Sequence, residues 1–237
     1  MSAADDPLAH LLIDRRATVE RRQLDDTSWV DVVAGFVRDP AVALAQVLAE
    51  VPFAQHEVLR YDRYVPERRL GGTVRPAANL LAGQIDLHLR AAYRQQFDGA
   101  VAILYRDGTD FQGLHSDREM KWLDDTLIGI VVLGVRRPFV LRPRGSWQQA
   151  AIDRVPAGAG PDDIVLMPGE GDLLVMGGRC QADWLHGVPA ADADRPRVSL
   201  TWRWTSRRGR PDTAPGYFDG RQFSDRPRQR GIRRAPG

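Results

Sequence analysis

The stretch LIGIVVLGVRRPFVLRP, residues 127–143, contains two short apolar runs that are separated by a turn at Gly134. Runs of this length, rich in β-branched residues and bounded by glycine or proline, are typical of strands. Similar runs recur through the second half of the chain, at residues 100–105, 164–167, 173–176 and 198–204. Many short strands at such spacing predict an all-β sandwich or barrel.

The first half of the chain predicts helices. Asp39 and Pro40 form an N-cap and first-turn proline pair, which predicts a helix through residue 50. A broad apolar face predicts a second helix over residues 77–97. Residues 1–38 show no firm periodicity. The layout that we expect is therefore helices first, followed by a β core.

Two segments between these elements are also informative. The alternating pattern of residues 56–65 predicts a strand, and the pairs Gly71-Gly72 and Arg75-Pro76 are expected to end it. Residues 143–162 are rich in glycine, proline and alanine, which predicts a surface loop.

The overall composition is that of a soluble globular protein. The chain has 237 residues, of which 43% are apolar and 27% charged, and this suits one sizeable domain with terminal extensions. No apolar run approaches the roughly 18 residues needed to cross a membrane, and the first 16 residues lack the pattern of a secretory signal. The single cysteine, Cys180, cannot form an intrachain disulfide. We therefore expect a cytoplasmic protein with no membrane partner.

Positive charge is concentrated near the C-terminus. The net charge is only +2, but residues 203–237 contain ten arginines and three aspartates. Such a segment can bind phosphates electrostatically. It can equally be a soluble, disordered end of the chain. The sequence leaves both interpretations open.

Three residues have the chemistry of a metal site. His115 and Asp117 are two apart, so on a strand their side chains lie on one face. His186 follows 69 residues after Asp117. Two histidines and one carboxylate form the facial triad of non-haem Fe(II) oxygenases, which leaves positions open for a cosubstrate and O₂. Zinc-dependent hydrolysis is an alternative use of the same ligands.

Two arginines near the metal residues predict an anion site. Arg197 and Arg203 are six apart, so they share one face of the strand predicted there. A buried guanidinium needs an anionic partner, and its planar fork matches a carboxylate. The cosubstrate 2-oxoglutarate carries two carboxylates. Alternatively, both arginines face solvent while Val198, Leu200 and Trp202 face the core.

Several segments taken together resemble the AlkB family of nucleic-acid dealkylating dioxygenases. The resemblance covers residues 100–203 and is carried by five ordered motifs: LYRDGTD (104–110) before His115-Ser116-Asp117, IVVLG (130–134), GDLLVMGG (171–178), QADWLHGVP (181–189) and RVSLTWR (197–203). Five motifs in the right order are far more specific than any one of them.

The resemblance implies an α+β fold with a mainly β core. This core would be a double-stranded β-helix, or jelly roll, with N-terminal helices and a substrate-recognition lid. The implied division is a helical and lid region at residues 1–98, the catalytic core at 99–206 and a basic tail at 207–237.

The resemblance also implies roles for the site residues. His115, Asp117 and His186 would bind Fe(II), and Arg203 would lie near the metal and cosubstrate as part of the catalytic set. Tyr105 and Arg197 would bind the distal carboxylate of 2-oxoglutarate. The family usually has asparagine at the positions of Ile103 and Ser199, both in the cosubstrate site. Ser199 can still donate a hydrogen bond and is kept in the cosubstrate set, whereas Ile103 cannot.

Four further residues are candidates for substrate binding. Glu119 occupies a position where the family places an acidic residue against the target base, and Trp122 could stack on that base. Arg68 and Arg69 belong to YVPERR (64–69), which resembles a nucleotide-recognition loop. For each residue the alternative is a structural one: a solvated acid, an apolar lid contact or solvated arginines.

The implied activity is oxidative removal of N-alkyl groups from nucleobases, with release of formaldehyde and succinate. Fe(II), 2-oxoglutarate and O₂ are the expected cofactors and cosubstrates. Alkylated nucleic acid, with single strands preferred, is the expected partner of a monomeric enzyme. One alternative is an oxygenase of the same type that acts on a small molecule or protein. The other is a binding module with a non-catalytic metal site.

Overall fold

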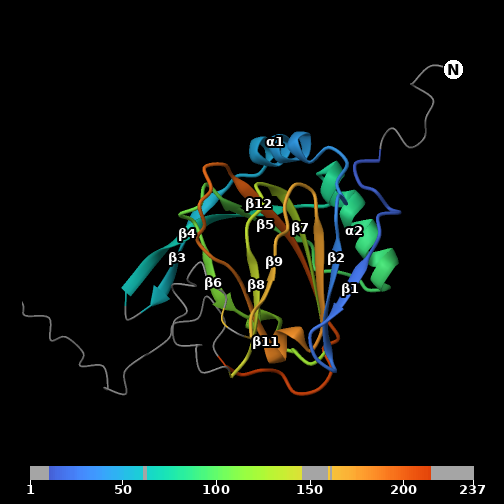
Figure 1. Ribbon diagram of the computed structural model, residues 1–237, viewed down its shortest axis with the longest axis vertical. Coiled ribbons are helices and arrows are strands. Elements are labelled where there is room, and N and C mark those ends of the chain that lie inside the picture. Colours follow the sequence, from blue (N-terminus) through green and yellow to red (C-terminus); the bar gives the residue numbers. More distant parts are fainter. Residues whose placement is uncertain (1–10, 61–62, 146–159, 161, 215–237) are drawn as a thin grey trace, which may run out of the picture.

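The computed structural model describes residues 11–60, 63–145, 160 and 162–214. Much of the loop predicted at 143–162 and most of the basic tail predicted at 207–237 therefore lie outside the described residues. Two antiparallel sheets make up the body of the protein (Figure 1). Within the described segments, no helix is long and apolar enough to span a membrane.

The larger sheet contains eight strands from both halves of the chain. In spatial order these are β1 (Glu20–Gln23), β2 (Ser28–Val33), β10 (Leu173–Gly178), β7 (Thr126–Gly134), β12 (Arg197–Thr205), β5 (Ala100–Tyr105), β4 (Arg63–Val74) and β3 (Ala54–Arg60). The smaller sheet has the order β6 (Gln112–His115), β11 (Trp184–Val188), β8 (Phe139–Pro143) and β9 (Ile164–Leu166). Two antiparallel sheets with these crossovers form the jelly-roll core that the sequence predicts.

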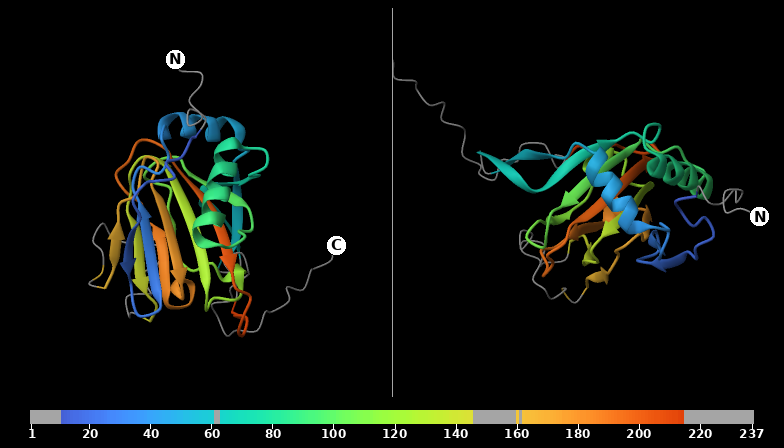
Figure 2. Two further views of the ribbon diagram at one scale, coloured as in Figure 1. Left: turned by 90° about the vertical axis from the view of Figure 1, so that its right-hand side faces the viewer. Right: turned by 90° about the horizontal axis from the view of Figure 1, so that it is seen from above.

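Three helices and a 3₁₀ turn complete the described structure. They are α1 (Pro40–Glu50), α2 (Leu80–Tyr93), the short α3 (Cys180–Asp183) and the 3₁₀ segment Arg118–Met120. Figure 2 shows α2 along the outer face of the larger sheet, α1 across the upper end of this layer, and the β3–β4 hairpin extending beyond one edge. The helices therefore cover one face of this sheet and leave the other for the smaller sheet.

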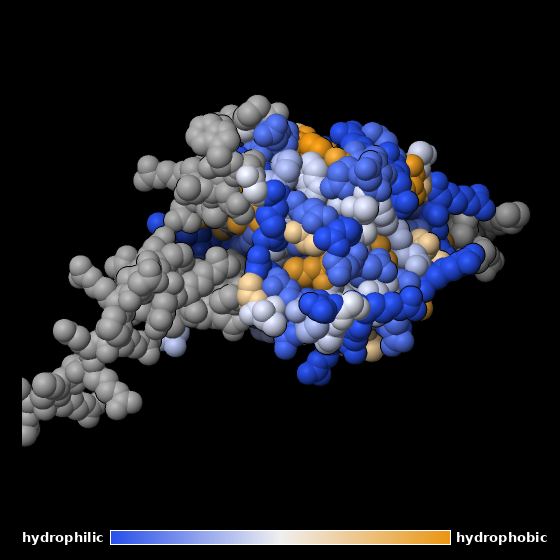
Figure 3. All heavy atoms as spheres, turned by 90° about the horizontal axis from the view of Figure 1, so that it is seen from below, coloured by the Kyte–Doolittle hydropathy of each residue, from blue (hydrophilic) through white to orange (hydrophobic). Residues whose placement is uncertain are grey.

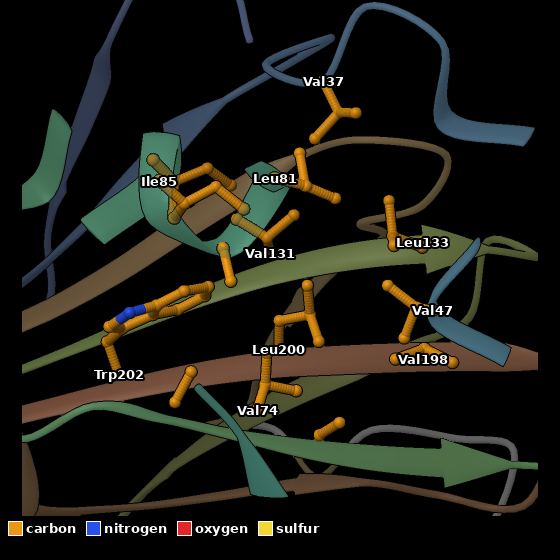
Figure 4. Packing of buried hydrophobic residues seen from close by; sticks show 14 of the residues in the cluster. Val37, Val47, Val74, Leu81, Ile85, Val131, Leu133, Val198, Leu200 and Trp202 are labelled. Atoms are coloured by element: carbon orange, nitrogen blue, oxygen red, sulfur yellow. The ribbon is translucent and has the colours of Figure 1, made fainter. Parts of the chain in front are cut away.

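The larger sheet has an apolar core on each face, because side chains alternate along its strands. On β12, Val198, Leu200 and Trp202 point outward and pack with residues of α2 such as Ile85 (Figure 4). On the inner face, Ile128, Ile130 and Val132 of β7 pack with Phe139 and Leu141 of the smaller sheet. The residues of β12 at odd positions consequently face the space between the sheets.

The first helix is confirmed, while the second is shorter than predicted. Helix α1 begins at Pro40 and ends at Glu50, as predicted, although the Asp39 side chain makes no capping hydrogen bond. Helix α2 begins at Leu80 rather than at residue 77, because the Asn79 side chain accepts a hydrogen bond from the Ala82 backbone and caps the helix there. It ends at Tyr93, since Arg94 adopts a left-handed conformation with φ 54°.

The single strand predicted at residues 56–65 is in fact parts of two strands, β3 and β4, and the prediction that Gly71-Gly72 ends it is also wrong. Strand β4 runs through both glycines to Val74 and pairs with β3 on one side and β5 on the other. A Cβ on Gly72 would lie 2.5 Å from Val51 Cγ1. Glycine is therefore present because another part of the chain approaches the strand closely, and not because the strand stops.

The expected order of helices first and strands second also needs correction. Residues 20–33 form β1 and β2, and β2 pairs with β10 in the larger sheet. With β3 and β4, the N-terminal part of the chain supplies strands as well as helices. Local pattern does not reveal β1 and β2, because β1 is exposed throughout and β2 carries a buried aspartate, Asp31, among its apolar residues.

Asp25 connects the β1–β2 turn to the start of β11. Its Oδ1 accepts hydrogen bonds from the backbone N–H groups of Thr27 and Ser28, both at 2.8 Å. Its Oδ2 accepts one from Trp184 Nε1 at 2.5 Å. Burial raises the pKa of Asp25, but the Trp184 indole and the backbone donors outweigh it and bring the pKa to about 2.

Replacing Asp25 with alanine should lower the free energy of unfolding at pH 7 by about 1–3 kcal/mol, because the donors of Thr27, Ser28 and Trp184 lose a charged acceptor. The carboxylate has a lower pKa in the folded protein than in the unfolded chain. Its stabilising effect is therefore present above pH 4 and declines as the pH falls toward 2. Urea denaturation measures this effect: the free energies of unfolding of wild-type protein and Asp25→Ala should differ at pH 7 and become nearly equal at pH 2.5. Asp26→Ala, at the exposed neighbouring position, is the matched control. If Asp25→Ala and Asp26→Ala lose the same free energy of unfolding at pH 7, the role of Asp25 is contradicted.

Candidate active site

His115, Asp117 and His186 meet between β6 and β11. His115 and His186 are directly opposite each other in the register of these strands, and their ring centroids are 4.3 Å apart. Asp117 Oδ1 lies 3.4 Å from His115 Nε2. One ligand atom from each residue lies within 4.8 Å of the others, and no other such group of three is found among the described residues.

Neighbouring groups orient two of the three side chains. His115 Nδ1 lies 2.9 Å from the Gly113 carbonyl oxygen, so this nitrogen carries the proton and Nε2 presents a lone pair toward Asp117. A ring N–H bound to a carbonyl is the usual support for a metal-binding histidine. Arg203 Nε donates to Asp117 Oδ2 at 2.6 Å, which leaves Oδ1 directed at the histidines.

The electrostatics of the three residues suit a divalent cation. Burial lowers the pKa of His186 to about 3, so its imidazole is neutral at physiological pH. Burial would raise the pKa of Asp117, but Arg203 and the two histidines hold it well below its usual value. His186 Nδ1 is buried and has no hydrogen-bond partner among the described residues. The set therefore offers neutral imidazole and ionised carboxylate donors, which fit a bound metal.

Arg197 forms a second, cationic part of the site. It is opposite Tyr105 in the register of β12 and β5, and its side chain is fully buried. Nη1 donates to the Arg137 carbonyl at 3.2 Å, whereas Nε and Nη2 have no partner among the described residues. Burial lowers the pKa of Arg197 to about 10, so it remains charged at neutral pH. A buried guanidinium with two unused donors is suited to an anion.

Arg137 supplies a second buried positive charge, which the sequence did not indicate. Its guanidinium carbon lies 5.4 Å from the Tyr105 ring centroid, and that of Arg197 lies 6.0 Å from it. Its terminal nitrogens donate to the backbone carbonyls of Asp107, Asp110 and Pro189. Neither arginine forms an ion pair with a carboxylate in the described part of the chain. Only the fold reveals Arg137, because the sequence Arg136-Arg137-Pro138 is also that of an ordinary polar turn.

The residues of β12 at odd positions connect these two groups. Ser199 is buried and lies on the same face as Arg197, opposite Ile103 of β5. The two positions at which asparagine was expected therefore face each other across neighbouring strands. Arg203, further along this face, contacts Asp117 of the candidate triad.

The candidate substrate residues occupy different environments. Glu119 is exposed in the 3₁₀ segment after Asp117, and Trp122 is half-buried, with its carbonyl accepting from Thr205 Oγ1 at 2.5 Å. On β4, Arg68 is exposed and Arg69 is buried. Arg69 Nη2 lies 2.9 Å from Glu67 Oε1, and its Nε donates to Gln112 Oε1. Arg69 is thus part of an internal ion pair, while its neighbour faces solvent.

A cavity of about 840 Å³ adjoins this part of the site. Its walls come from β3, β4 and β5, the end of α1 and the loop before α2, and include His56, Glu67, Arg69, Gly71 and Ile103. Arg69 also acts electrostatically on Tyr105, so the cavity and the cationic group are neighbours. The volume is within the range of small-ligand sites.

Comparison with known proteins identifies the family. The pattern of the 2OG-Fe(II) oxygenase superfamily matches residues 63–203. The mouse alpha-ketoglutarate-dependent dioxygenase alkB homolog 3 is 30% identical over 207 residues, which cover 78% of this chain and 69% of the mouse protein. The DNA oxidative demethylase ALKBH2 of Arabidopsis thaliana is 30% identical over 118 residues, or 46% of this chain and 38% of that protein.

A solved structure supports the fold independently. HygX from Streptomyces hygroscopicus, with nickel and 2-oxoglutarate bound, aligns with a TM-score of 0.54 at 12% identity and covers 75% of this chain and 83% of its own. At this identity the likeness concerns the fold alone. The superfamily match decides between the alternatives for the metal, because its members use Fe(II) and 2-oxoglutarate rather than hydrolytic zinc. The chain is therefore an oxygenase that belongs to the AlkB family of the 2OG-Fe(II) oxygenase superfamily.

Proposed function

We propose that this enzyme removes N-alkyl groups from nucleobases in DNA or RNA, with a preference for single strands. The observation that carries the proposal is the largely buried triad of His115, Asp117 and His186 together with the buried guanidinium groups of Arg197 and Arg137. The relatives supply the substrate class, since one of them is named as a DNA oxidative demethylase. We further propose that the enzyme acts as a monomer in the cytoplasm.

In this proposal His115, Asp117 and His186 are the iron ligands. Bound Fe(II), with 2-oxoglutarate and O₂, supplies the oxidation of a substrate C–H bond. The hydrogen bond from His115 to the Gly113 carbonyl maintains the tautomer that binds metal through Nε2. Arg203 holds the Asp117 carboxylate in place and adds positive charge next to it.

Arg197 and Tyr105 bind the distal carboxylate of 2-oxoglutarate. Among the described residues, two donors of Arg197 have no partner and its charge has no counter-ion, so both are available to the cosubstrate. Arg137 adds a second positive charge that compensates for the absence of a donor at Ile103. The Ser199 hydroxyl is positioned on the same face and can donate a hydrogen bond.

The alkylated base leaves its stack and enters the site from the side of the large cavity. Glu119 and Trp122 follow the iron ligand Asp117 by two and five positions along the chain. A carboxylate at Glu119 favours bases whose methylation creates a positive charge, such as 1-methyladenine and 3-methylcytosine. Trp122 stacks on the base, exposed Arg68 binds the backbone, and Arg69 shapes the cavity wall through its ion pair with Glu67.

The products of the proposed reaction contain both atoms of O₂. One atom of O₂ enters the N-methyl group as a hydroxyl, and the other enters succinate as 2-oxoglutarate loses CO₂. The resulting N-hydroxymethyl group breaks its N–C bond and releases formaldehyde, and the base nitrogen recovers its ordinary valence. The protein orients the base and excludes water from the reacting groups.

Incubation with Fe(II), 2-oxoglutarate, O₂ and a single-stranded oligonucleotide containing 3-methylcytosine should give succinate and loss of the methyl group in equal amounts. Mass spectrometry of the oligonucleotide and quantification of succinate measure the two products. The unmethylated oligonucleotide and a methylated duplex are the controls. Succinate without demethylation would redirect the enzyme to a small molecule or protein. The absence of succinate from folded, iron-loaded protein would refute the assignment.

A further inference from the structure

A second cavity, of about 240 Å³, lies next to the segment that follows Asp117. Its charged lining consists of four basic side chains and two acidic ones: Arg118, Lys121, Arg144, Arg210, Asp124 and Asp212. Its elements are the 3₁₀ segment, α3, the end of β8 and the chain after β12. They lie at the lower end of the molecule in Figure 1, and hydrophilic residues predominate where Figure 3 shows this end from below.

Both acidic side chains already have basic partners. Asp212 Oδ2 lies 3.2 Å from Arg118 Nη1, and Asp124 pairs with Arg179, which is not part of the cavity lining. In the described part of the chain, Lys121, Arg144 and Arg210 have no carboxylate partner. The cavity therefore has a clear excess of positive charge.

Arg144 is held in place within this cavity. Its Nη2 donates to Ser116 Oγ and its Nε to the Ala182 carbonyl, both at 2.7 Å. Its hydrogen-bond acceptors in the described part of the chain are all uncharged, and burial together with the neighbouring Arg118 lowers the pKa of its guanidinium. A fixed guanidinium beside another positive charge is stabilised when an anion binds to both.

The position of this cavity relates it to the active site. Ser116, which binds Arg144, lies between His115 and Asp117, and Arg118 follows Asp117 directly. Ala182 precedes the metal residue His186 by four positions. The cavity thus shares its walls with both chain segments that carry the triad.

We propose that this cavity binds a backbone phosphate of the strand that carries the alkylated base. The inference rests on the proposed function, because the phosphate is that of its substrate. A phosphate presents several acceptor oxygens to converging guanidinium and ammonium donors, and contacts of this kind set the position of a strand without reading its sequence. The cavity would hold the strand while the base occupies the metal site.

The test is the double variant Lys121→Ala/Arg210→Ala. Both residues are exposed, and their side chains have no hydrogen bond or ion pair among the described residues, so the fold should be retained. KM for the methylated oligonucleotide should rise about tenfold, as for the loss of one charged hydrogen bond. The slope of log affinity against log salt should fall in magnitude by about 0.7 for each phosphate that the variant no longer binds. Arg22→Ala, on the exposed strand β1 at one edge of the larger sheet, is the control and should keep wild-type values.

A methylated nucleoside, which lacks backbone phosphate, distinguishes this role from a general defect. The ratio of KM for oligonucleotide to KM for nucleoside should rise about tenfold in the double variant and stay constant in Arg22→Ala. An unchanged ratio and salt slope would overturn the phosphate site while leaving demethylation established. If wild-type enzyme neither binds nor demethylates the oligonucleotide, the proposed function and this inference both fail. If the double variant no longer binds inorganic phosphate but its oligonucleotide parameters are unchanged, the site binds free phosphate and the strand assignment is wrong.

Discussion

Replacing Asp117 with asparagine should reduce both iron affinity and succinate formation by at least about 100-fold. Mutation of a group that merely supports a metal ligand reduces metal affinity or activity by about 10- to 100-fold, so loss of a charged ligand itself should reduce them further. The amide is close in size to the carboxylate, and its oxygen can still accept the hydrogen bond from Arg203. The fold should therefore survive while the negative charge next to the metal is removed.

Metal titration by intrinsic fluorescence and succinate quantification are the two measurements for this variant. Asp125→Asn changes an exposed aspartate a few residues along the same segment and should retain wild-type metal affinity. Wild-type Fe(II) affinity in Asp117→Asn would remove Asp117 from the ligand set. An inactive variant with normal affinity would instead give Asp117 a different role.

Replacing Arg197 with methionine should leave the stability of the free protein unchanged or higher, but should weaken the binding of 2-oxoglutarate. In the free protein the side chain buries a positive charge with two unused donors. Removing that charge should leave the free energy of unfolding unchanged or raise it by about 1–2 kcal/mol. The affinity for 2-oxoglutarate should fall by roughly 30-fold or more, because removing one member of a buried charge pair costs about 2–5 kcal/mol.

Denaturation with and without 2-oxoglutarate, in the presence of nickel, measures both effects. At a concentration 100 times its Kd, the cosubstrate should stabilise wild-type protein by about 2.7 kcal/mol, and most of this should disappear in Arg197→Met. Arg195→Met, at an exposed position two residues earlier, should keep the cosubstrate effect. Full stabilisation of Arg197→Met by 2-oxoglutarate would show that the carboxylate binds elsewhere, with Arg137 as the next candidate.

These two variants also test how the site depends on its surroundings. Asp117 is held by Arg203 from β12, and Arg197 is two positions before Ser199 on the same strand. Strand β12 thus contacts the triad through Arg203 near one end and carries Arg197 of the cationic group at the other. Strand β12 lies between β7 and β5 in the centre of the larger sheet, where pairing on both sides restricts its movement.

Local sequence was enough to predict several features of the protein. The start and end of α1 followed from Asp39-Pro40 and the apolar pattern after it, because a first-turn proline acts within one turn, although the Asp39 side chain makes no capping hydrogen bond. Most strands of the second half followed from apolar runs with turn residues at their ends, but β6 and β11, which carry His115 and His186, did not. His115, Asp117 and His186 could be selected because few residue types bind a divalent metal and the first two are two apart.

Other features depended on contacts between distant parts of the chain. Burial of Asp31 in β2 and passage of β4 through Gly71-Gly72 contradict local propensity, and pairing with neighbouring strands determines both. The burial of Arg69 and the exposure of Arg68 depend on which face of β4 meets Gln112. No local pattern distinguishes the two arginines.

The sequence by itself determined which residues can bind the metal and where most strands of the core lie, since ligand chemistry and side-chain alternation are local properties. Only the tertiary structure decided that His186 lies opposite His115, that Arg137 and Arg197 surround Tyr105 without a counter-ion in the described part of the chain, and that a second basic cavity adjoins the triad. The physical reason is that strand register and the burial of charge depend on long-range pairing between the sheets. The free energy of that pairing belongs to the whole fold and not to any one segment.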